Sequence, residues 1–124
     1  MTASGAHTVT DDLTVVIPVR NAERLIDDCL TSVLATRPRE VIVVDGMSTD
    51  RTVEAASRYP VRLLSDEGAG LPAARRIGVQ AATTPLVALV DVDVVVGPGD
   101  LDRLLAEFEQ GGYTALQAGL ESVS

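Results

Sequence analysis

The sequence predicts a single α/β domain built on a mostly parallel sheet. Short apolar runs of strand length alternate with stretches whose apolar residues recur at helical spacing. This alternation is repeated three times, which is typical of parallel strands joined by right-handed crossover helices. The 124 residues, of which 46% are hydrophobic and 23% charged, are enough to bury one core.

The first two expected strands are short apolar runs, as in strands that are buried on both faces. Five strands are expected in all. They cover residues 13–19, 40–46, 61–65, 85–91 and about 113–123. Helical spacing is found within residues 25–34, 53–57, 74–81 and 101–108. Ser48, Thr49 and Asp50 are candidate N-caps of the second helix, Asp100 is expected to cap the last one, and Gly111-Gly112 should end it.

The two ends of the chain are expected to differ in order. We expect residues 1–11 to form a flexible tail and residues 12–124 to form the domain. The tail lacks a basic start and an apolar core, so it is not a signal peptide. No apolar run approaches membrane-spanning length. We therefore expect a cytoplasmic protein with no membrane span in this chain.

Several kinds of chemistry are excluded by composition. All ten basic residues are arginine, which excludes Schiff-base catalysis and the lysine-bearing phosphate loop. The single histidine, His7, lies in the expected tail, so a Ser-His-Asp triad or histidine-rich zinc site cannot form. Cys29, on the apolar stripe of a helix, is expected to be a packed thiol. The net charge of −8 makes nucleic acid a poor partner, whereas a smaller phosphate could bind through a divalent cation.

Polar residues gather where the expected strands end. Asp91 and Asp93 interrupt an apolar run, and in an extended chain their side chains would point the same way. The segment 18–21 and the pair Asp45-Gly46 end two other strands. Ligands of such sheets gather at the carboxyl ends of the strands, so we expect these residues to form one site.

Four segments resemble a known family. "VVIPVRNAERLIDDCLTSV", "EVIVVDGMSTDRT", "GLPAARRIGVQAA" and "LVALVDVDV" occur in the order found in the nucleotide-binding half of family-2 glycosyltransferases. The resemblance runs from about Leu13 to the end of the chain. It implies the Rossmann-like GT-A fold and a site for a nucleoside-diphosphate sugar, UDP- or GDP-linked, together with Mg²⁺ or Mn²⁺.

The resemblance also implies roles for individual residues. Asp45 would hydrogen-bond the base, Arg75 would lie near the nucleotide, and Asp91-Val92-Asp93 matches the family's Asp-x-Asp motif. Three positions depart from the pattern: Arg20 stands at a common aromatic, Gly46 at a frequent second aspartate, and Arg76 at the usual asparagine. The implied nucleotide-binding residues are Pro18, Val19, Arg20, Asp45, Arg75, Asp91 and Val92, and the implied metal ligands are Asp91 and Asp93.

The expected function is inverting transfer of a sugar to an unknown acceptor, with this chain as the donor-binding part. The family carries its acceptor site and catalytic base beyond the matched region, so no catalytic residue is assigned here. Two alternatives stay open, a non-catalytic nucleotide-binding or interaction module and a nucleotidyltransferase, although the lysine-bearing loop of the latter is missing. The last strand would leave an unpaired edge, so we also expect a homo-oligomer.

Overall fold

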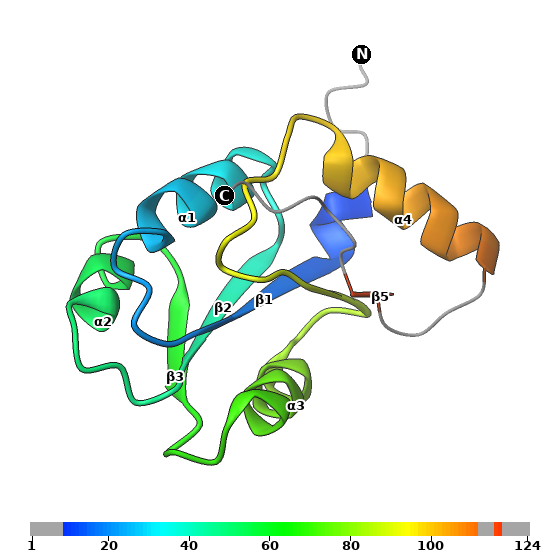
Figure 1. The fold of residues 1–124 in the computed structure, drawn as a ribbon. Coiled ribbons are helices and arrows are strands. Elements are labelled where there is room, and N and C mark those ends of the chain that lie inside the picture. Colours follow the sequence, from blue (N-terminus) through cyan, green and yellow to red (C-terminus); the bar gives the residue numbers. More distant parts are fainter. Residues whose placement is uncertain (1–8, 112–115, 118–124) are drawn as a thin grey trace.

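The fold is a five-stranded parallel sheet covered by helices on both faces (Figure 1). The structure is a computed structural model that describes residues 9–111 and 116–117. The strand order is β3-β2-β1-β4-β5, which confirms the predicted α/β class. The strands are β1 (Leu13–Val19), β2 (Glu40–Asp45), β3 (Arg62–Ser65), β4 (Leu86–Leu89) and β5 (Leu116–Gln117). The helices are α1 (Ile26–Ala35), α2 (Thr52–Ala56), α3 (Leu71–Ala81), α4 (Asp100–Gly111) and the 3₁₀ helix η1 (Val9–Asp12).

Alternate residues of β1 belong to different cores. Val15 and Ile17 pack with residues of α1, α2 and α4, whereas Val16 packs on the other face with Ala74 of α3. This follows from the two-residue period of a strand. Figure 1 shows α1 and α2 together on one face of the sheet and α3 on the opposite face. Among the described helices, none is both long and apolar enough to cross a membrane.

Helix α3 lies unusually close to the central strand. A Cβ atom placed on Gly78 would lie 2.2 Å from Cγ1 of Val16, a side chain with no exposed surface. Only a residue without a side chain fits at this point of α3. Gly78 therefore sets the distance between α3 and the sheet, and with it the position of the N-terminal end of α3.

Pro18 is tolerated in the central strand because β4 ends early. Leu89, the last residue of β4, lies opposite Val16, and the next amide, that of Val90, donates to the Val16 carbonyl at 3.0 Å. The backbone of Pro18 points toward the β4 side of the strand, as the backbone of Val16 does. At the level of Pro18, however, β4 has already ended. The missing N–H of Pro18 therefore removes no hydrogen bond from the β1–β4 ladder.

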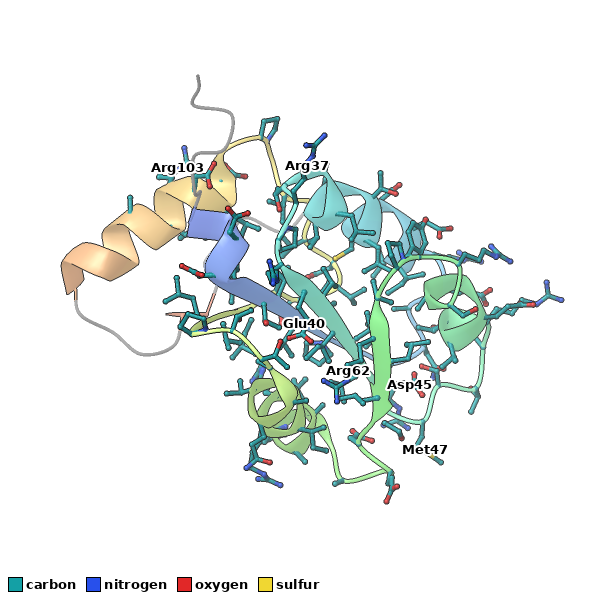
Figure 2. All side chains as sticks on the ribbon, turned by 180° about the vertical axis from the view of Figure 1, so that it is seen from behind. Arg37, Glu40, Asp45, Met47, Arg62 and Arg103 are labelled. Carbon is teal, nitrogen blue, oxygen red and sulfur yellow. The ribbon has the colours of Figure 1, made fainter. Side chains whose placement is uncertain are left out.

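A polar cluster ties the strands together at their amino ends. The Glu40 carboxylate accepts hydrogen bonds from Thr14 Oγ1 at 2.8 Å and from the Thr83 backbone N–H at 3.0 Å, and lies 3.8 Å from Arg62 (Figure 2). Burial favours the neutral form of Glu40. The hydrogen bonds from Thr83 and Thr14 and the charge of Arg62 outweigh burial, so the pKa of Glu40 lies below its ordinary value.

The observed boundaries differ from the sequence prediction in a few places. Residues 9–12 form η1, although 9–11 were expected in the tail; residues 1–8 of that tail lie outside the described residues. Of the apolar residues expected at helical spacing in α2, Ala56 is buried but Val53 is exposed, and Ala55 also faces the core. Of the expected last strand, Leu116–Gln117 pairs in parallel with β4, and the remainder falls outside the described residues.

Candidate functional site

The carboxyl ends of β1 and β2 lie side by side. Val19 is the register partner of Asp45, and the Gly46 amide donates to the Val19 carbonyl at 2.8 Å. Next to them, Asp45 pairs with Ser65 at the end of β3. The residues that follow these strands therefore share one edge of the sheet, where ligands of parallel sheets are commonly bound.

Asp91 and Asp93 lie in a turn beyond β4, whereas the sequence prediction extended the strand to Asp91. The Val94 amide donates to the Asp91 carbonyl at 3.0 Å, which closes the turn. The extended geometry expected for this motif is therefore wrong. Val92, between the two aspartates, packs half-buried against the core on the α1 face and so anchors the turn.

A pocket of about 320 Å³ opens at this edge of the sheet. Its walls come from the end of β1, the loops that follow β2 and β3, and the first turns of α3. Three of the expected nucleotide-binding residues, Pro18, Val19 and Arg20, line it. The other lining residues are Gly46, Met47, Asp66, Gly68, Gly70, Leu71 and Ala74.

Asp45 directly precedes the pocket residue Gly46 but is not itself a lining residue, and one of its carboxylate oxygens has no hydrogen bond. Its side chain is buried, and Oδ2 accepts a hydrogen bond from the Ser48 amide at 3.2 Å. Among the described residues, Oδ1 of Asp45 is the buried side-chain oxygen without a hydrogen-bond partner. Leaving such an atom unpaired costs about 1–3 kcal/mol. A buried acceptor held in this way is suited to an N–H donor from a ligand.

Asp66 is a pocket residue that sequence reasoning missed. It is only 4% exposed, and its carboxylate accepts hydrogen bonds from the amides of Gly68 at 2.7 Å and Gly70 at 3.2 Å. Both glycines have a positive φ, so the carboxylate holds a loop that most residues could not form. The signal in the sequence was an aspartate followed by glycines two and four positions later.

Arg75 and the aspartate turn come from different elements but lie close together. Arg75 of α3 forms an ion pair with Asp91 at 3.8 Å, and more than half of the Asp91 side chain is exposed. Arg76, its neighbour on α3, is exposed. The structure thus brings Arg75 and Asp91 to the same place.

Cys29 of α1 lies against this turn and is a packed thiol, as expected. Its Sγ is 3.9 Å from the Asp91 carbonyl oxygen. Burial, followed by the negative charges of Asp93 and Asp91, raises the pKa of the Cys29 thiol to about 12. A thiol with so high a pKa is not a nucleophile at neutral pH.

The donor set of the turn fits a cation only if the ligand contributes as well. Within the described part of the chain, no three residues of His, Cys, Asp or Glu are grouped as metal ligands. Asp91 and Asp93 provide two carboxylates on one short turn. Mg²⁺ is commonly bound by one or two carboxylates together with substrate phosphates. The residues present therefore fit a divalent cation that is shared with a bound phosphate.

The family of the chain is shown by comparison with known proteins. The family model described as glycosyl transferase family 2 matches residues 14–124. The chain belongs to this family. Membership favours the glycosyltransferase interpretation over a nucleotidyltransferase, and it agrees with the resemblance found in the sequence.

Three relatives illustrate the similarity. An uncharacterized glycosyltransferase of Mycobacterium tuberculosis is 40% identical over 103 residues, which cover 82% of this chain and 45% of the relative. Glucosyl-3-phosphoglycerate synthase of M. tuberculosis, solved with Mn²⁺, UDP and glucosyl-3-phosphoglycerate, is 25% identical with a TM-score of 0.70 over 86% of this chain and 41% of that chain. A mannosyltransferase from Pyrobaculum calidifontis, solved with GDP-Man and Mn²⁺, is 28% identical with a TM-score of 0.71 over 78% and 32%. The chain thus spans less than half the length of these relatives.

Proposed function

We propose that this chain is the donor-binding part of an inverting glycosyltransferase that uses a UDP- or GDP-linked sugar. The observation that carries the proposal is the pocket at the strand ends, which Pro18, Val19 and Arg20 line; Asp45, which directly precedes the lining residue Gly46, has a buried Oδ1 without a hydrogen-bond partner. The solved relatives, which hold UDP or GDP-Man with Mn²⁺, support the choice of ligand.

The residues of the pocket would bind the nucleoside. Pro18 and Val19 offer apolar surface to the base and ribose, and Arg20 offers a cation at the rim. Asp45 Oδ1 would accept a hydrogen bond from an N–H of the base and would thereby gain a partner. Such a contact discriminates between ligands because a base without that N–H leaves a buried oxygen unpaired.

Asp91 and Asp93 would hold Mg²⁺ or Mn²⁺ next to the diphosphate, with Val92 contributing the backbone between them. The bound cation would neutralise the charge that develops on the diphosphate leaving group. Arg75, already paired with Asp91, would place a second positive charge beside the phosphates. Inverting transfer also needs a general base for the acceptor hydroxyl, and we propose that this base and the acceptor site are formed by the further length found in the relatives.

Calorimetric titration with UDP and GDP, first in EDTA and then in Mn²⁺, tests the proposal. We expect binding that depends on the cation and is lost in Asp93→Asn. Glu54→Gln is the matched control, because it removes the same charge from an exposed position of α2. Equal affinities in EDTA and in Mn²⁺ would contradict the metal role, and no binding of either nucleotide would contradict the donor site.

A donor-consumption assay with a panel of acceptors separates the enzyme from a non-catalytic binding module. We expect the 124-residue chain to bind the donor but to transfer sugar negligibly, since general-base help alone is worth about 10²–10⁴-fold in rate. Self-association and a cytoplasmic location stay predictions, to be tested by light scattering and by cell fractionation.

A further inference from the structure

Two large apolar side chains stand exposed at the pocket. Met47, in the loop after β2, is 56% exposed, and Leu71, the first residue of α3, is 48% exposed. These values exceed those of the other exposed large hydrophobic residues in the described chain, which lie at 40–41%. Both side chains line the same pocket, so the exposed apolar surface is concentrated where a ligand would enter.

Met47 occupies a backbone conformation that is costly for its type. Its φ is 63°, in the left-handed region that glycine adopts freely and a methionine does not. The side chain contributes little to the core, because most of it is exposed. Its Cγ lies 3.9 Å from the position that a Cβ on Gly68 would take, so Met47 extends toward the loop that follows β3. Figure 2 shows Asp45 at the end of β2 and Met47 farther out in the same loop.

We propose that Met47 and Leu71 form an apolar clamp that holds the flat faces of the base in the nucleoside-diphosphate ligand. The clamp rests on the proposed function, since it presupposes a nucleotide in this pocket. No aromatic side chain lines the pocket among the described residues, so packing on the base falls to aliphatic side chains and to the guanidinium of Arg20. A thioether packs favourably on an aromatic ring, and a leucine adds apolar contact area. The strained backbone conformation of Met47 would then serve to place its side chain against the ligand.

The clamp makes a prediction that separates contact with the base from a structural role. Met47→Gly relieves the left-handed strain but gives the unfolded chain more freedom, so we expect a nearly unchanged unfolding midpoint. The affinity for UDP or GDP in Mn²⁺ should nevertheless fall about 3- to 20-fold. Leu71→Ala should lower it similarly, and Met47→Leu should retain most of it because an apolar side chain remains.

Inorganic diphosphate with Mn²⁺ serves as the second probe because it has no base. We expect its affinity to be the same in wild type, Met47→Gly and Leu71→Ala. Val53→Ala is the matched control, since Val53 is an exposed apolar residue of α2 that lines none of the pocket. It should change neither affinity.

The outcomes distinguish the clamp from the proposed function. A nucleotide affinity that falls while that for diphosphate stays constant supports the clamp. Equal losses for nucleotide and diphosphate would show that Met47 acts by shaping the loop, and would overturn it. Unchanged nucleotide affinity in both variants would overturn the clamp and leave the proposed function standing. A wild-type chain that binds neither UDP nor GDP would overturn both.

Discussion

Replacing Gly78 with alanine should destabilise the protein, although alanine is the better helix former. The new Cβ would lie 2.2 Å from Val16 Cγ1 and 3.1 and 3.2 Å from two further Val16 atoms. Non-bonded carbon atoms are optimally about 3.5–4.0 Å apart. Val16 has no exposed surface and a stiff β-branched side chain in the central strand, so α3 must move instead.

The magnitude follows from two opposing contributions. Overpacking a core costs about 1–3 kcal/mol, and the higher helix propensity of alanine returns about 1 kcal/mol. Because the closest atoms belong to a rigid strand, we expect a net loss of about 1–2 kcal/mol. For a chain of this size each kcal/mol lowers the unfolding midpoint by about 3–6 °C.

A double-mutant cycle with Val16→Ala provides the assay. Urea and thermal unfolding would be measured for wild type, Gly78→Ala, Val16→Ala and the double variant. Removing the Val16 methyl groups makes room for the new Cβ, so Gly78→Ala should cost much less in that background. If Gly78→Ala raised the midpoint in the wild-type background, as at an exposed helix position, the close approach of α3 would be refuted.

The remaining predictions concern three charged residues. Arg75→Gln removes the ion pair of Asp91, so Mn²⁺ alone should bind about 2- to 5-fold more tightly, while UDP or GDP in Mn²⁺ should bind more weakly. Arg76→Gln is the control, and equal affinities in the two variants would count against the ion pair. Glu40 has a lowered pKa in the folded state, so its contribution to stability is complete above its ordinary value of 4.5 and is lost as the pH falls below it. The difference in unfolding midpoint between wild type and Glu40→Gln should therefore become smaller in acid. A difference that does not change with pH would contradict this. Asp66→Ala should lower the unfolding midpoint, because two loop amides lose a charged acceptor at about 1–3 kcal/mol. Asp66→Asn, which keeps one acceptor oxygen, should have an unfolding midpoint between those of wild type and Asp66→Ala. A wild-type midpoint in both variants would refute the role of Asp66 in holding the loop.

The central strand was predictable because its signal is local. The seven residues of β1, all of them apolar except Thr14, have the same bounds in the sequence prediction and in the structure. The end of β4 was not predictable in this way. Val90, Val92 and Val94 continue the apolar pattern, but the chain turns at Asp91 because pairing with β1 stops after Val16. When the neighbouring strand determines where a strand ends, the residues of the strand itself do not predict that end.

The candidate site was predictable as a set of residues but not as a set of contacts. Asp45 and Arg75 were assigned through the family resemblance, yet the unused Oδ1 of Asp45 and the ion pair from Arg75 to Asp91 depend on the packing of separate elements. Asp66 was missed because an aspartate before glycines usually marks an exposed turn. Its burial comes from the loop it organises, which sequence periodicity does not describe.

The Glu40 cluster has a consequence for how this domain can be altered. One carboxylate joins β1, β2, β3 and the segment before β4, at the end of the sheet opposite the pocket. The loops 46–50 and 66–70 lie at the other end and are held by separate contacts: Asn21 Oδ1 accepts a hydrogen bond from the Thr49 amide, and the Asp66 carboxylate accepts from the amides of Gly68 and Gly70. Binding loops on a rigid scaffold tolerate exchange. Transplanting these two loops from a relative, together with the residues that contact them, should change ligand preference while the sheet still folds.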